Sequence, residues 1–359
     1  MTTIAHILGD WSRNIGNAFF QLGGLYALKK SVPDVQISLI GEMPGYPSYW
    51  NPRGGNPTNF FDWAEYINVD YLVLMGPLFR PETEKIWGQG LARIMAKGTK
   101  LVLLGVGMMK YDDGYVKTYR ELLMRYRPYI FTSRDVETYD KLGDLAEHPY
   151  DGIDFGFFVS DLYTPIGLFS DERKWIAFNF DKIPEPCVSL SKTFLSSGQY
   201  DFEFAFDDWI WGVRFPRFRQ KLAERSRYLM FLEGLFPGNS LTQIGDYEIV
   251  RTDHRPHPLL RRKTYRYPRV MVNDVPYAYF EIYKGARLTL SNRVHACVAA
   301  LAYGNHAMLF TRSPRSRLLE RMGLDDIRKH PMAINKDFLE QEKKSLLKFL
   351  ADVFRRGQG

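Results

Sequence analysis

Cysteine is nearly absent from this sequence of 359 residues, which contains only Cys187 and Cys297. Two cysteines so far apart do not suggest a disulfide framework or a zinc site, and their scarcity is typical of a reducing, cytoplasmic compartment. The sequence also lacks any run of about 18 uninterrupted apolar residues, and its N-terminal MTTIAHILGDW lacks the basic region and long apolar stretch of a signal peptide. We therefore expect a cytoplasmic protein with neither export nor a membrane span.

The common nucleotide-binding motifs are missing as well. The chain has no G-x-x-x-x-G-K-[ST], and GDWSRNIGN, which follows the first predicted strand, is not a G-x-G-x-x-G loop. The net charge of +7 favours anionic partners in general, but no run of Lys and Arg selects nucleic acid, lipid or acidic glycan. Because neither a recognition helix nor an aromatic-basic motif occurs, we expect no nucleic-acid binding.

The sequence does contain a regular alternation of strand and helix patterns. Its length predicts two domains, and 45% hydrophobic with 25% charged residues is typical of a folded protein. The first half predicts strands over 3–8, 35–40, 71–75, 100–106 and 129–132, and helices over 18–30, 84–97, 117–126 and 136–142. This alternation indicates an α/β protein whose mostly parallel sheet is covered by helices on both faces.

The alternation lapses after residue 152 and resumes with a predicted strand over 175–180. We place a domain boundary near Ser170, which gives one α/β domain over 1–170, a second over 171–335, and a closing amphipathic helix over 336–359 that packs back across them. The aromatic and acidic region 184–216 fits no pattern, and we interpret it as an insertion over the cleft between the domains.

Arg293 and His295 stand two residues apart where a predicted strand, 288–290, gives way to a predicted helix, 296–303. A helix N-terminus carries unpaired N–H groups and a partial positive charge, so an Arg and a His placed there build a pocket for an anion. Two costly polar groups beside an apolar helix favour a functional role.

A second basic cluster, Arg312, Arg315 and Arg317, follows the next predicted strand, 307–310. Loops after successive parallel strands face one crevice, so the two clusters could converge on one multiply anionic small molecule. The alternative is that Arg315, Arg317 and Arg321 form the exposed face of an amphipathic helix.

The loop between the first strand and the first helix carries Gly9, Asp10, Asn14, Gly16 and Asn17. Its glycines let a ligand approach the backbone, and we predict that Asp10, Asn14 and Asn17 bind substrate. An equally good interpretation is a tight turn with Asp10 and Asn17 as helix caps.

Arg134 lies just beyond the predicted strand 129–132 and just before the helix 136–142. This position suits anion binding at a strand end. The structural alternative is an ion pair with its neighbours Asp135 and Glu137.

Two further sets of polar residues carry little weight. Asp151, Asp154 and Asp161 are too dispersed to predict a metal site, so we expect none. His254 and His257 lie in DHRPHP, whose spacing matches no metal motif, and we interpret that segment as a surface loop.

Taken together, these segments resemble the polysaccharide pyruvyl transferase family, in order along nearly the whole chain. The matching pieces are GDWSRNIGN, DYLVLMGP, LVLLGVGM, TSRDVETYDKLG, DFGFFVSDL, SNRVHACVAALAYGNHAMLF and SPRSRLLERMGL. The resemblance implies two Rossmann-like domains that face a central cleft, as in the GT-B fold. It also implies transfer of pyruvate from phosphoenolpyruvate to two hydroxyls of a sugar, as a ketal.

Carried over residue by residue, the resemblance implies that Arg134, Arg293 and Arg315 bind the phosphate and carboxylate of the donor. His295 would lie beside the enol carbon as the catalytic acid, with Arg293 next to it, and we add Arg317 to the donor-binding set. Guanidinium groups suit both acidic groups of this donor. The partners are then phosphoenolpyruvate, as co-substrate without a further cofactor, and a sugar or glycan acceptor.

Several points stay open. DFGFFVSDL lacks the proline expected after its first aspartate, and region 184–216 matches nothing in the family. A lipid-linked acceptor, peripheral association with the membrane face and an oligomer are all compatible with the sequence. One alternative is a GT-B glycosyltransferase that uses a nucleotide sugar, although the chain has no pair of glutamates eight positions apart after Glu185. A third interpretation is a glycan-binding protein without catalysis.

Overall fold

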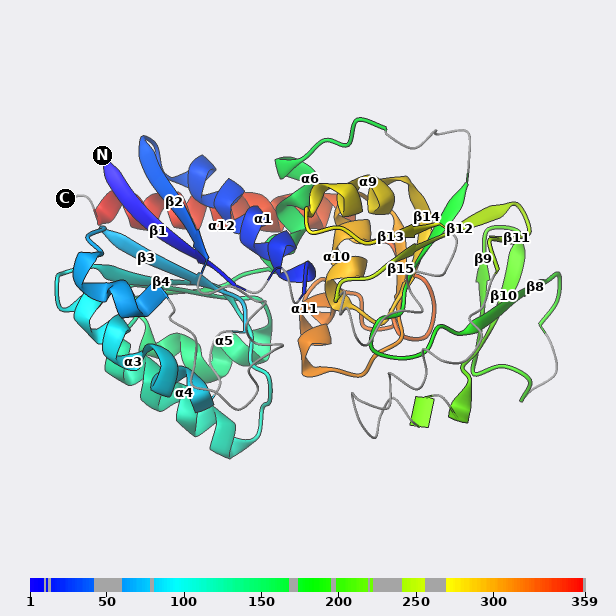
Figure 1. Ribbon diagram of the computed structural model, residues 1–359, viewed down its shortest axis with the longest axis horizontal. Coiled ribbons are helices and arrows are strands. Elements are labelled where there is room, and N and C mark those ends of the chain that lie inside the picture. Colours follow the sequence, from blue (N-terminus) through cyan, green and yellow to red (C-terminus); the bar gives the residue numbers. More distant parts are fainter. Residues whose placement is uncertain are drawn as a thin grey trace.

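A computed structural model gives the arrangement of the chain (Figure 1). It describes residues 1–9, 11, 14–41, 60–77, 81–167, 174–194, 198–218, 220–221, 241–255 and 269–357, with the backbone alone for 81–86. Two α/β units lie side by side, each built on its own sheet, and the C-terminal helix runs back along the first unit. The expected α/β class with parallel sheets is confirmed.

The first unit contains a six-stranded, fully parallel sheet in the order β2-β1-β3-β4-β5-β6. Its strands are β1 (Thr2–Leu8), β2 (Val35–Gly41), β3 (Tyr71–Met75), β4 (Lys100–Val106), β5 (Ile130–Ser133) and β6 (His148–Asp151). Its helices are α1 (Gly16–Ser31), η1 (Phe60–Tyr66), α3 (Pro81–Met95), α4 (Asp113–Tyr126), α5 (Val136–Leu142), η2 (Gly143–Leu145), η3 (Phe155–Phe158) and α6 (Val159–Leu162).

The second unit contains a sheet in the order β11-β12-β7-β14-β15, with β13 beside β12, and all its pairs are parallel except β11 with β12. Its strands are β7 (Trp175–Asn179), β11 (Gln243–Ile244), β12 (Tyr247–Thr252), β13 (Val270–Met271), β14 (Ala286–Ser291) and β15 (His306–Leu309). Its helices are α9 (Tyr277–Gly285), α10 (Val294–Ala302), η5 (Pro314–Ser316) and α11 (Arg317–Glu320), and α12 (Lys336–Arg356) closes the chain.

The central strands form because their residues are apolar without alternation. Every residue of β3 and all but the first residue of β4 are buried, as expected for strands covered on both faces. α10 is apolar all round for the same reason, and only His295 of its residues before Ala302 is not fully buried. Strands β6 and β12 were not expected from the sequence, since β6 contains a proline and β12 carries Glu248 and Arg251.

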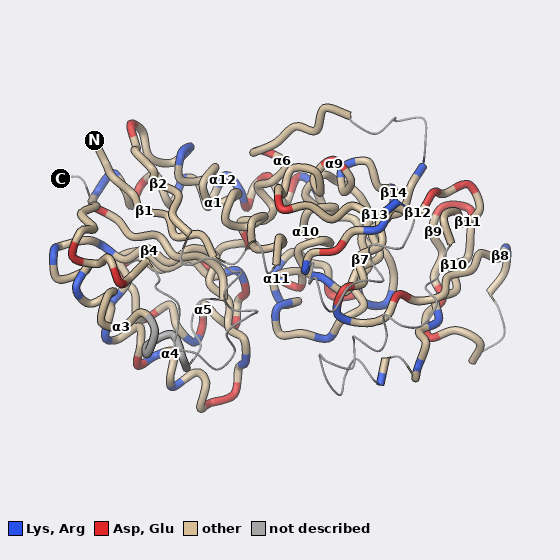
Figure 2. Tube along the Cα trace, in the orientation of Figure 1, with Lys and Arg blue, Asp and Glu red and all other residues tan. Residues whose placement is uncertain are grey.

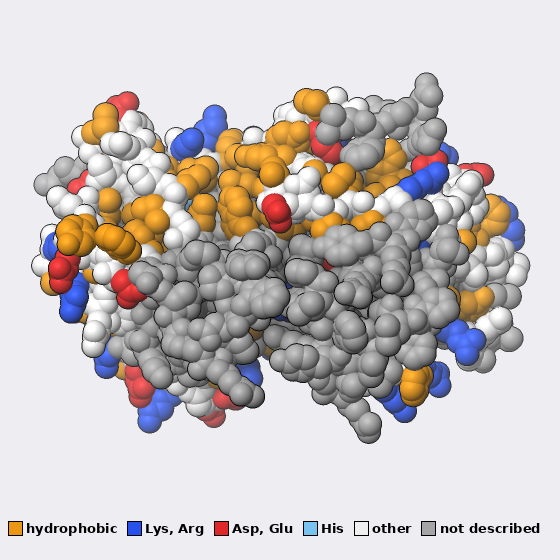
Figure 3. Space-filling model, viewed as in Figure 1, with side chains coloured by type: hydrophobic (Ala, Val, Ile, Leu, Met, Phe, Trp, Pro, Cys, Tyr) orange, Lys and Arg blue, Asp and Glu red, His pale blue; other side chains and the backbone are white. Residues whose placement is uncertain are grey.

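One hydrophobic core joins the two units. It includes Phe19 of α1, Phe155 of η3, Phe280 of α9 and Val298 of α10, so the helices between the sheets pack on one another directly. Hydrophobic side chains also run across the outer face above α1, α6 and α9 (Figure 3). The relative position of the two units is therefore set by packing as well as by the chain connection.

Region 184–216 does not extend over the cleft as we expected. It forms a three-stranded antiparallel sheet of β8 (Cys187–Ser191), β10 (Trp209–Arg214) and β9 (Phe202–Phe206). One face of this sheet packs on the second sheet through the fully buried Trp211, at the end of the molecule away from the first unit. It thus takes the place of a helical layer, and its aromatic residues serve as core.

Helix α12 returns to the first unit, where it packs on α1 and β6. Asn335 caps its start, and the buried Lys343 forms an ion pair at 2.6 Å with the more exposed Asp161. Within the described residues, none of the helices has the length and apolar character needed to cross a membrane. The proposed domain limits at 170 and 335 stay predictions.

The packing of α1 on η3 gives a test of this arrangement. A β-carbon at Gly23 would lie 1.9 Å from the Phe155 carbonyl oxygen, so Gly23→Ala must push the two elements apart. We expect a loss of unfolding free energy of about 2 kcal/mol or more, measured by urea denaturation. Gly41→Ala is the control, because a β-carbon there meets nothing within 4 Å. Equal stability of the two variants would contradict the packing.

Candidate functional site

The polar residues of interest lie at the carboxyl ends of the parallel strands, where the two sheets face each other. Arg134 follows β5, Asp154 follows β6, Asp181 follows β7 and Arg293 follows β14. Charged residues lie along α5 and α11 (Figure 2), and Glu137 of α5 forms an ion pair with Arg317 of α11. This edge of an α/β sheet is where ligands usually bind.

Arg134 and Asp154 form a fully buried ion pair at 3.0 Å, with side chains 2% and 1% exposed. The guanidinium packs closely against Gly107, where a β-carbon would come within 2.4 Å of its Nε. The alternative that Arg134 pairs with its neighbours is wrong. Asp135 instead caps α5 by accepting from the Thr138 N–H, and Glu137 pairs with Arg317.

Asp154 also faces His295 from the other unit. Its Oδ2 lies 3.5 Å from His295 Nε2, and its Oδ1 accepts from the Gly156 N–H at 2.8 Å. Burial alone would raise the pKa of Asp154, but His295 and Arg134 hold it low, at about 2. Asp154 is therefore an anion that orients both an arginine and a histidine, a role that its position in the sequence does not reveal.

His295 is in the first turn of α10, as predicted, with its ring 5.0 Å from the ring of Phe20. Burial lowers its pKa, Asp154 opposes this effect, and the charges of Arg134 and Arg315 lower it further. The pKa of His295 therefore lies below its ordinary value of 6.5, and an anion bound beside the imidazole would raise it.

Arg293 takes the N-cap position of α10, but its side chain turns away from Asp154. Its Nε donates to Asp181 Oδ1, and its backbone N–H donates to Ser291 Oγ at 2.8 Å. The side chain is 7% exposed, and its buried Nη2 has no partner among the described residues. Arg293 and His295 thus face different parts of the crevice.

Arg315 and Arg317 have different surroundings. Arg315 reaches Met109 of the first unit, with its Nη2 2.9 Å from the sulfur, and its charge acts on His295. Arg317 pairs with Glu137 and lies 4.0 Å from the centre of the Tyr111 ring. The structure therefore brings Arg315 to the candidate site, while Arg317 contacts α5 and the loop after β4.

The loop before α1 is only partly described, and Asp10 lies outside the described residues. Asn14 donates through its side chain to Asn17 at 2.8 Å, and Asn17 lies 3.5 Å from the carbonyl oxygen of Gly9. These bonds agree with the turn interpretation. Gly16 nevertheless lies against His254 and His295, so this loop borders the site.

His254 corrects the sequence analysis most clearly, because it is fully buried and not in a surface loop. Its Nε2 is 2.6 Å from the hydroxyl of Tyr283, its N–H donates to Asp181 Oδ2 at 3.2 Å, and its carbonyl accepts from the Ile15 N–H at 2.9 Å. It therefore links the start of α1 to Asp181, which in turn binds Arg293. Alternate residues are buried along β12, the strand that ends two residues before His254. This alternation was the signal that could have revealed the buried position of His254. His257 lies outside the described residues.

Asp151 and Asp161 bind cations of the chain and not each other. Asp151 contacts Arg321 at 3.4 Å, and Asp161 pairs with Lys343. No group of three or more His, Cys, Asp or Glu in the described ranges could hold a metal ion. That the protein works without a metal ion stays a prediction.

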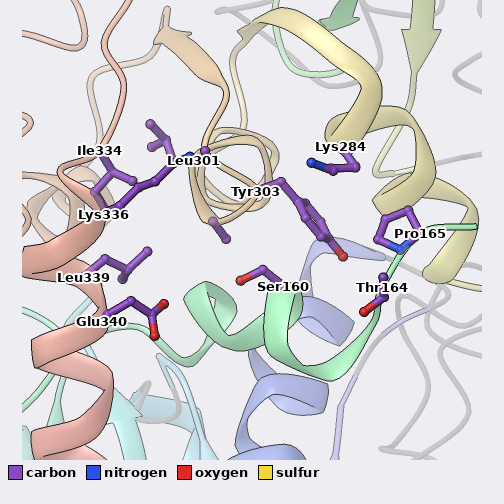
Figure 4. Close-up of a pocket in the computed structure, with 12 residues that line it drawn as sticks. Ser160, Thr164, Pro165, Lys284, Leu301, Tyr303, Ile334, Lys336, Leu339 and Glu340 are labelled. Atoms are coloured by element: carbon purple, nitrogen blue, oxygen red, sulfur yellow. The ribbon is translucent and has the colours of Figure 1, made fainter. Parts of the chain in front are cut away.

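A separate cavity of about 330 Å³ lies at the far end of α10 from His295 (Figure 4). Its lining includes Ser160 of α6, Leu301 and Tyr303 near the end of α10, and Lys336 and Leu339 at the start of α12. Its lining includes none of the strand-end residues Arg134, Asp154, Asp181, Arg293 and His295. The strand-end crevice is therefore the better candidate for the active site.

Comparisons with known proteins agree with this arrangement. The family model for polysaccharide pyruvyl transferase matches residues 14–314. The search of curated proteins found no significant match.

Among solved structures, MnaA of S. aureus bound to UDP shares 11% identity and a TM-score of 0.51, over 98% of this chain and 91% of that chain. UDP-GlcNAc 2-epimerase of Methanocaldococcus jannaschii, in complex with UDP-GlcNAc and UDP, has the same identity and TM-score over 99% of both chains. A putative UDP-N-acetylglucosamine 2-epimerase of Listeria monocytogenes gives 11% and 0.50, over 98% and 90%. These likenesses show the fold, which is a two-domain, Rossmann-like GT-B fold.

Replacing Asp154 tests the buried ion pair. Asp154→Asn leaves Arg134 buried without its counter-charge, so we expect a loss of about 3 kcal/mol in unfolding free energy at pH 7. Asp144→Asn breaks a pair with Arg120 in which the aspartate is 57% exposed, and should cost less than about 1 kcal/mol. Equal losses in urea denaturation of the two variants would contradict the account.

The pKa of His254 gives a prediction about acid sensitivity. Burial lowers it from 6.5 to about 3, so between these pH values the unfolded chain binds a proton that the folded chain does not. Stability should therefore fall as pH falls below 6.5, by up to about 1.4 kcal/mol per pH unit for this residue. His254→Gln should flatten the slope of unfolding free energy against pH, and the exposed control His330→Gln should not. An unchanged slope in His254→Gln would show that this histidine is not buried neutral.

Proposed function

The chain belongs to the polysaccharide pyruvyl transferase family, and from that premise we propose that it transfers the pyruvyl group of phosphoenolpyruvate to two hydroxyls of a sugar or glycan. The product is a pyruvate ketal, and phosphate is released. The family match itself does not specify the donor, the ketal product or the roles of His295 and the arginines. These three points are what we propose.

The observation that carries the proposal is the position of Asp154 between Arg134 and His295. One buried carboxylate contacts a guanidinium from its own unit at 3.0 Å and an imidazole from the other unit at 3.5 Å. A histidine oriented by a carboxylate and surrounded by arginines is a suitable proton donor beside a small anion.

The donor matches the charges of this site. Phosphoenolpyruvate carries a phosphate and a carboxylate on one planar enol, and Arg134, Arg293 and Arg315 supply guanidinium groups from three separate loops. Arginine is preferred for such groups because its planar fork donates two parallel hydrogen bonds. We assign donor binding to these three residues, and Arg317 to holding the two units together.

In the proposed reaction, His295 gives its proton to the methylene carbon, and an oxocarbenium-like centre develops at the neighbouring carbon. One sugar hydroxyl attacks this centre, the bond from carbon to the phosphate oxygen breaks, and the second hydroxyl closes the ketal. The two hydroxyls release two protons, which balance the one added to carbon and the one taken up by the leaving phosphate. His295 regains its proton in this exchange.

His295 must be protonated to start this sequence. Burial lowers its pKa, so the acid form depends on the negative charge that the donor brings and on Asp154. Donor binding would then take up a proton, which couples substrate binding to activation of the acid.

The acceptor in this proposal is a sugar or glycan, lipid-linked ones included, and the reaction needs no cofactor beyond its co-substrate. We propose that it takes place in the cytoplasm, in keeping with the near absence of cysteine. The nucleotide-sugar alternative has no specific support, because the structural likeness to UDP-binding proteins at 11% identity extends to the fold alone.

His295→Ala tests the catalytic role. Removal of a general acid should lower kcat by about 10²- to 10⁴-fold, while the Kd for phosphoenolpyruvate changes little because the arginines remain. The assay follows phosphate release from phosphoenolpyruvate with a panel of sugars and glycans, and mass spectrometry identifies the ketal. His330→Ala, in an exposed loop, is the matched control. Undiminished turnover in His295→Ala would remove it from the mechanism, and phosphate release without a ketal would contradict the proposed transfer.

A further inference from the structure

Basic side chains outside the family motif gather at the ends of adjacent strands in the second sheet. Phe178 of β7 lies opposite Arg251 of β12 in the parallel register. Lys182 and Arg255 each follow four residues later, so they occupy equivalent places in the loops after neighbouring strands. Parallel strands deliver such loops to the same edge.

These loops are in contact with each other and with Arg293. The N–H of His254, beside Arg255, donates to Asp181 Oδ2 at 3.2 Å. The other oxygen of Asp181, beside Lys182, accepts from Arg293 Nε. The charges of Arg293, Arg255 and Asp181 all act on Lys182, so these three basic side chains lie near one another and near one buried carboxylate.

Arg293 supplies a direct indication of a ligand. Its Nη2 is buried and has no hydrogen-bond acceptor in the described part of the chain. Buried donors are nearly always paired, and leaving one unpaired costs about 1–3 kcal/mol. An acceptor from outside the described residues, such as a bound anion, would complete this guanidinium.

The charges around Lys182 agree with an anion at this place. Partial desolvation lowers the pKa of its ammonium, and the neighbouring Arg293, Arg315 and Arg255 add to the effect against the opposing charge of Asp181, to give a pKa of about 8. Crowded like charges repel one another, and a bound dianion would relieve the repulsion.

This basic group is separate from the environment of His295. The imidazole faces Asp154 and Phe20 of the first unit, whereas Arg293 faces Asp181 of the second. The charge of Arg315 acts on both His295 and Lys182, so Arg315 lies near both groups. The crevice therefore offers one place for the reacting carbon and another for a phosphate.

We infer that Lys182, Arg255 and Arg293 form a phosphate subsite, which holds the phosphate of phosphoenolpyruvate and then the inorganic phosphate that leaves. The inference rests on the proposed function for the identity of the donor. When the bond from carbon to the phosphate oxygen breaks, the electron pair goes to that oxygen, and the nearby cations stabilise the developing charge. Lys182 and Arg255 are thus binding residues that the family motif does not contain.

Binding of inorganic phosphate tests the subsite without needing an acceptor. Calorimetry on the wild type should give saturable binding that phosphoenolpyruvate displaces. Lys182→Gln should raise the Kd for phosphate and the KM for phosphoenolpyruvate by about tenfold each. Lys182→Arg keeps the positive charge, so both constants should stay close to the wild-type values. Arg255→Gln should behave like Lys182→Gln. Lys344→Gln, an exposed lysine on α12, should leave both constants unchanged.

Unchanged phosphate binding in both Lys182→Gln and Arg255→Gln, with folding verified by thermal denaturation, would overturn the inference. So would phosphate that binds alongside phosphoenolpyruvate without competition, because the subsite would then belong to the acceptor. A wild type that binds phosphate through Lys182 but neither binds nor turns over phosphoenolpyruvate would contradict the proposed function and leave the phosphate subsite standing.

Discussion

The site depends on one buried carboxylate. Asp154 neutralises Arg134 within the first unit and orients His295 from the second, and all three side chains are largely or fully withdrawn from water. Burying a charge is costly unless it is paired, so neither Arg134 nor Asp154 could occupy this position alone. The same interaction that makes the pair tolerable in the interior also positions the histidine. The atoms that satisfy the electrostatic requirement of folding are therefore the same atoms that position the proposed general acid.

The helices between the sheets hold this carboxylate in place. α1, η3 and α10 share one hydrophobic core, in which Gly23 allows η3 to approach α1 and Gly156 leaves room for the side chains of Asp154 and Val298. His254 adds a polar link, since it connects the start of α1 to Asp181 and through it to Arg293. The crevice thus has one side with a histidine and its carboxylate and another with a basic cluster, and both are fixed by the packing beneath them.

Much of the fold could be predicted from sequence because its strands are short apolar runs and its helices are amphipathic or uniformly apolar. Prediction from these patterns failed at two places. Trp211 and its neighbours form a small sheet that packs on the second sheet, and β12 contains a charged residue, Arg251, which is buried in an ion pair with Glu185. For the site, the position of Arg293 and His295 in the first turn of α10 followed from local sequence. The importance of Asp154 and His254 did not, because their partners are distant in the chain and only the fold brings them together.

The central claim is that the crevice is a phosphoenolpyruvate site formed by both units. Calorimetric titration of the wild type with phosphoenolpyruvate, beside UDP and GDP, in buffers of different ionisation enthalpy tests it most directly. The account predicts saturable binding of phosphoenolpyruvate alone, accompanied by proton uptake near neutral pH as the pKa of His295 rises. Binding of a nucleotide in its place, or binding of phosphoenolpyruvate with no uptake of protons, would contradict it.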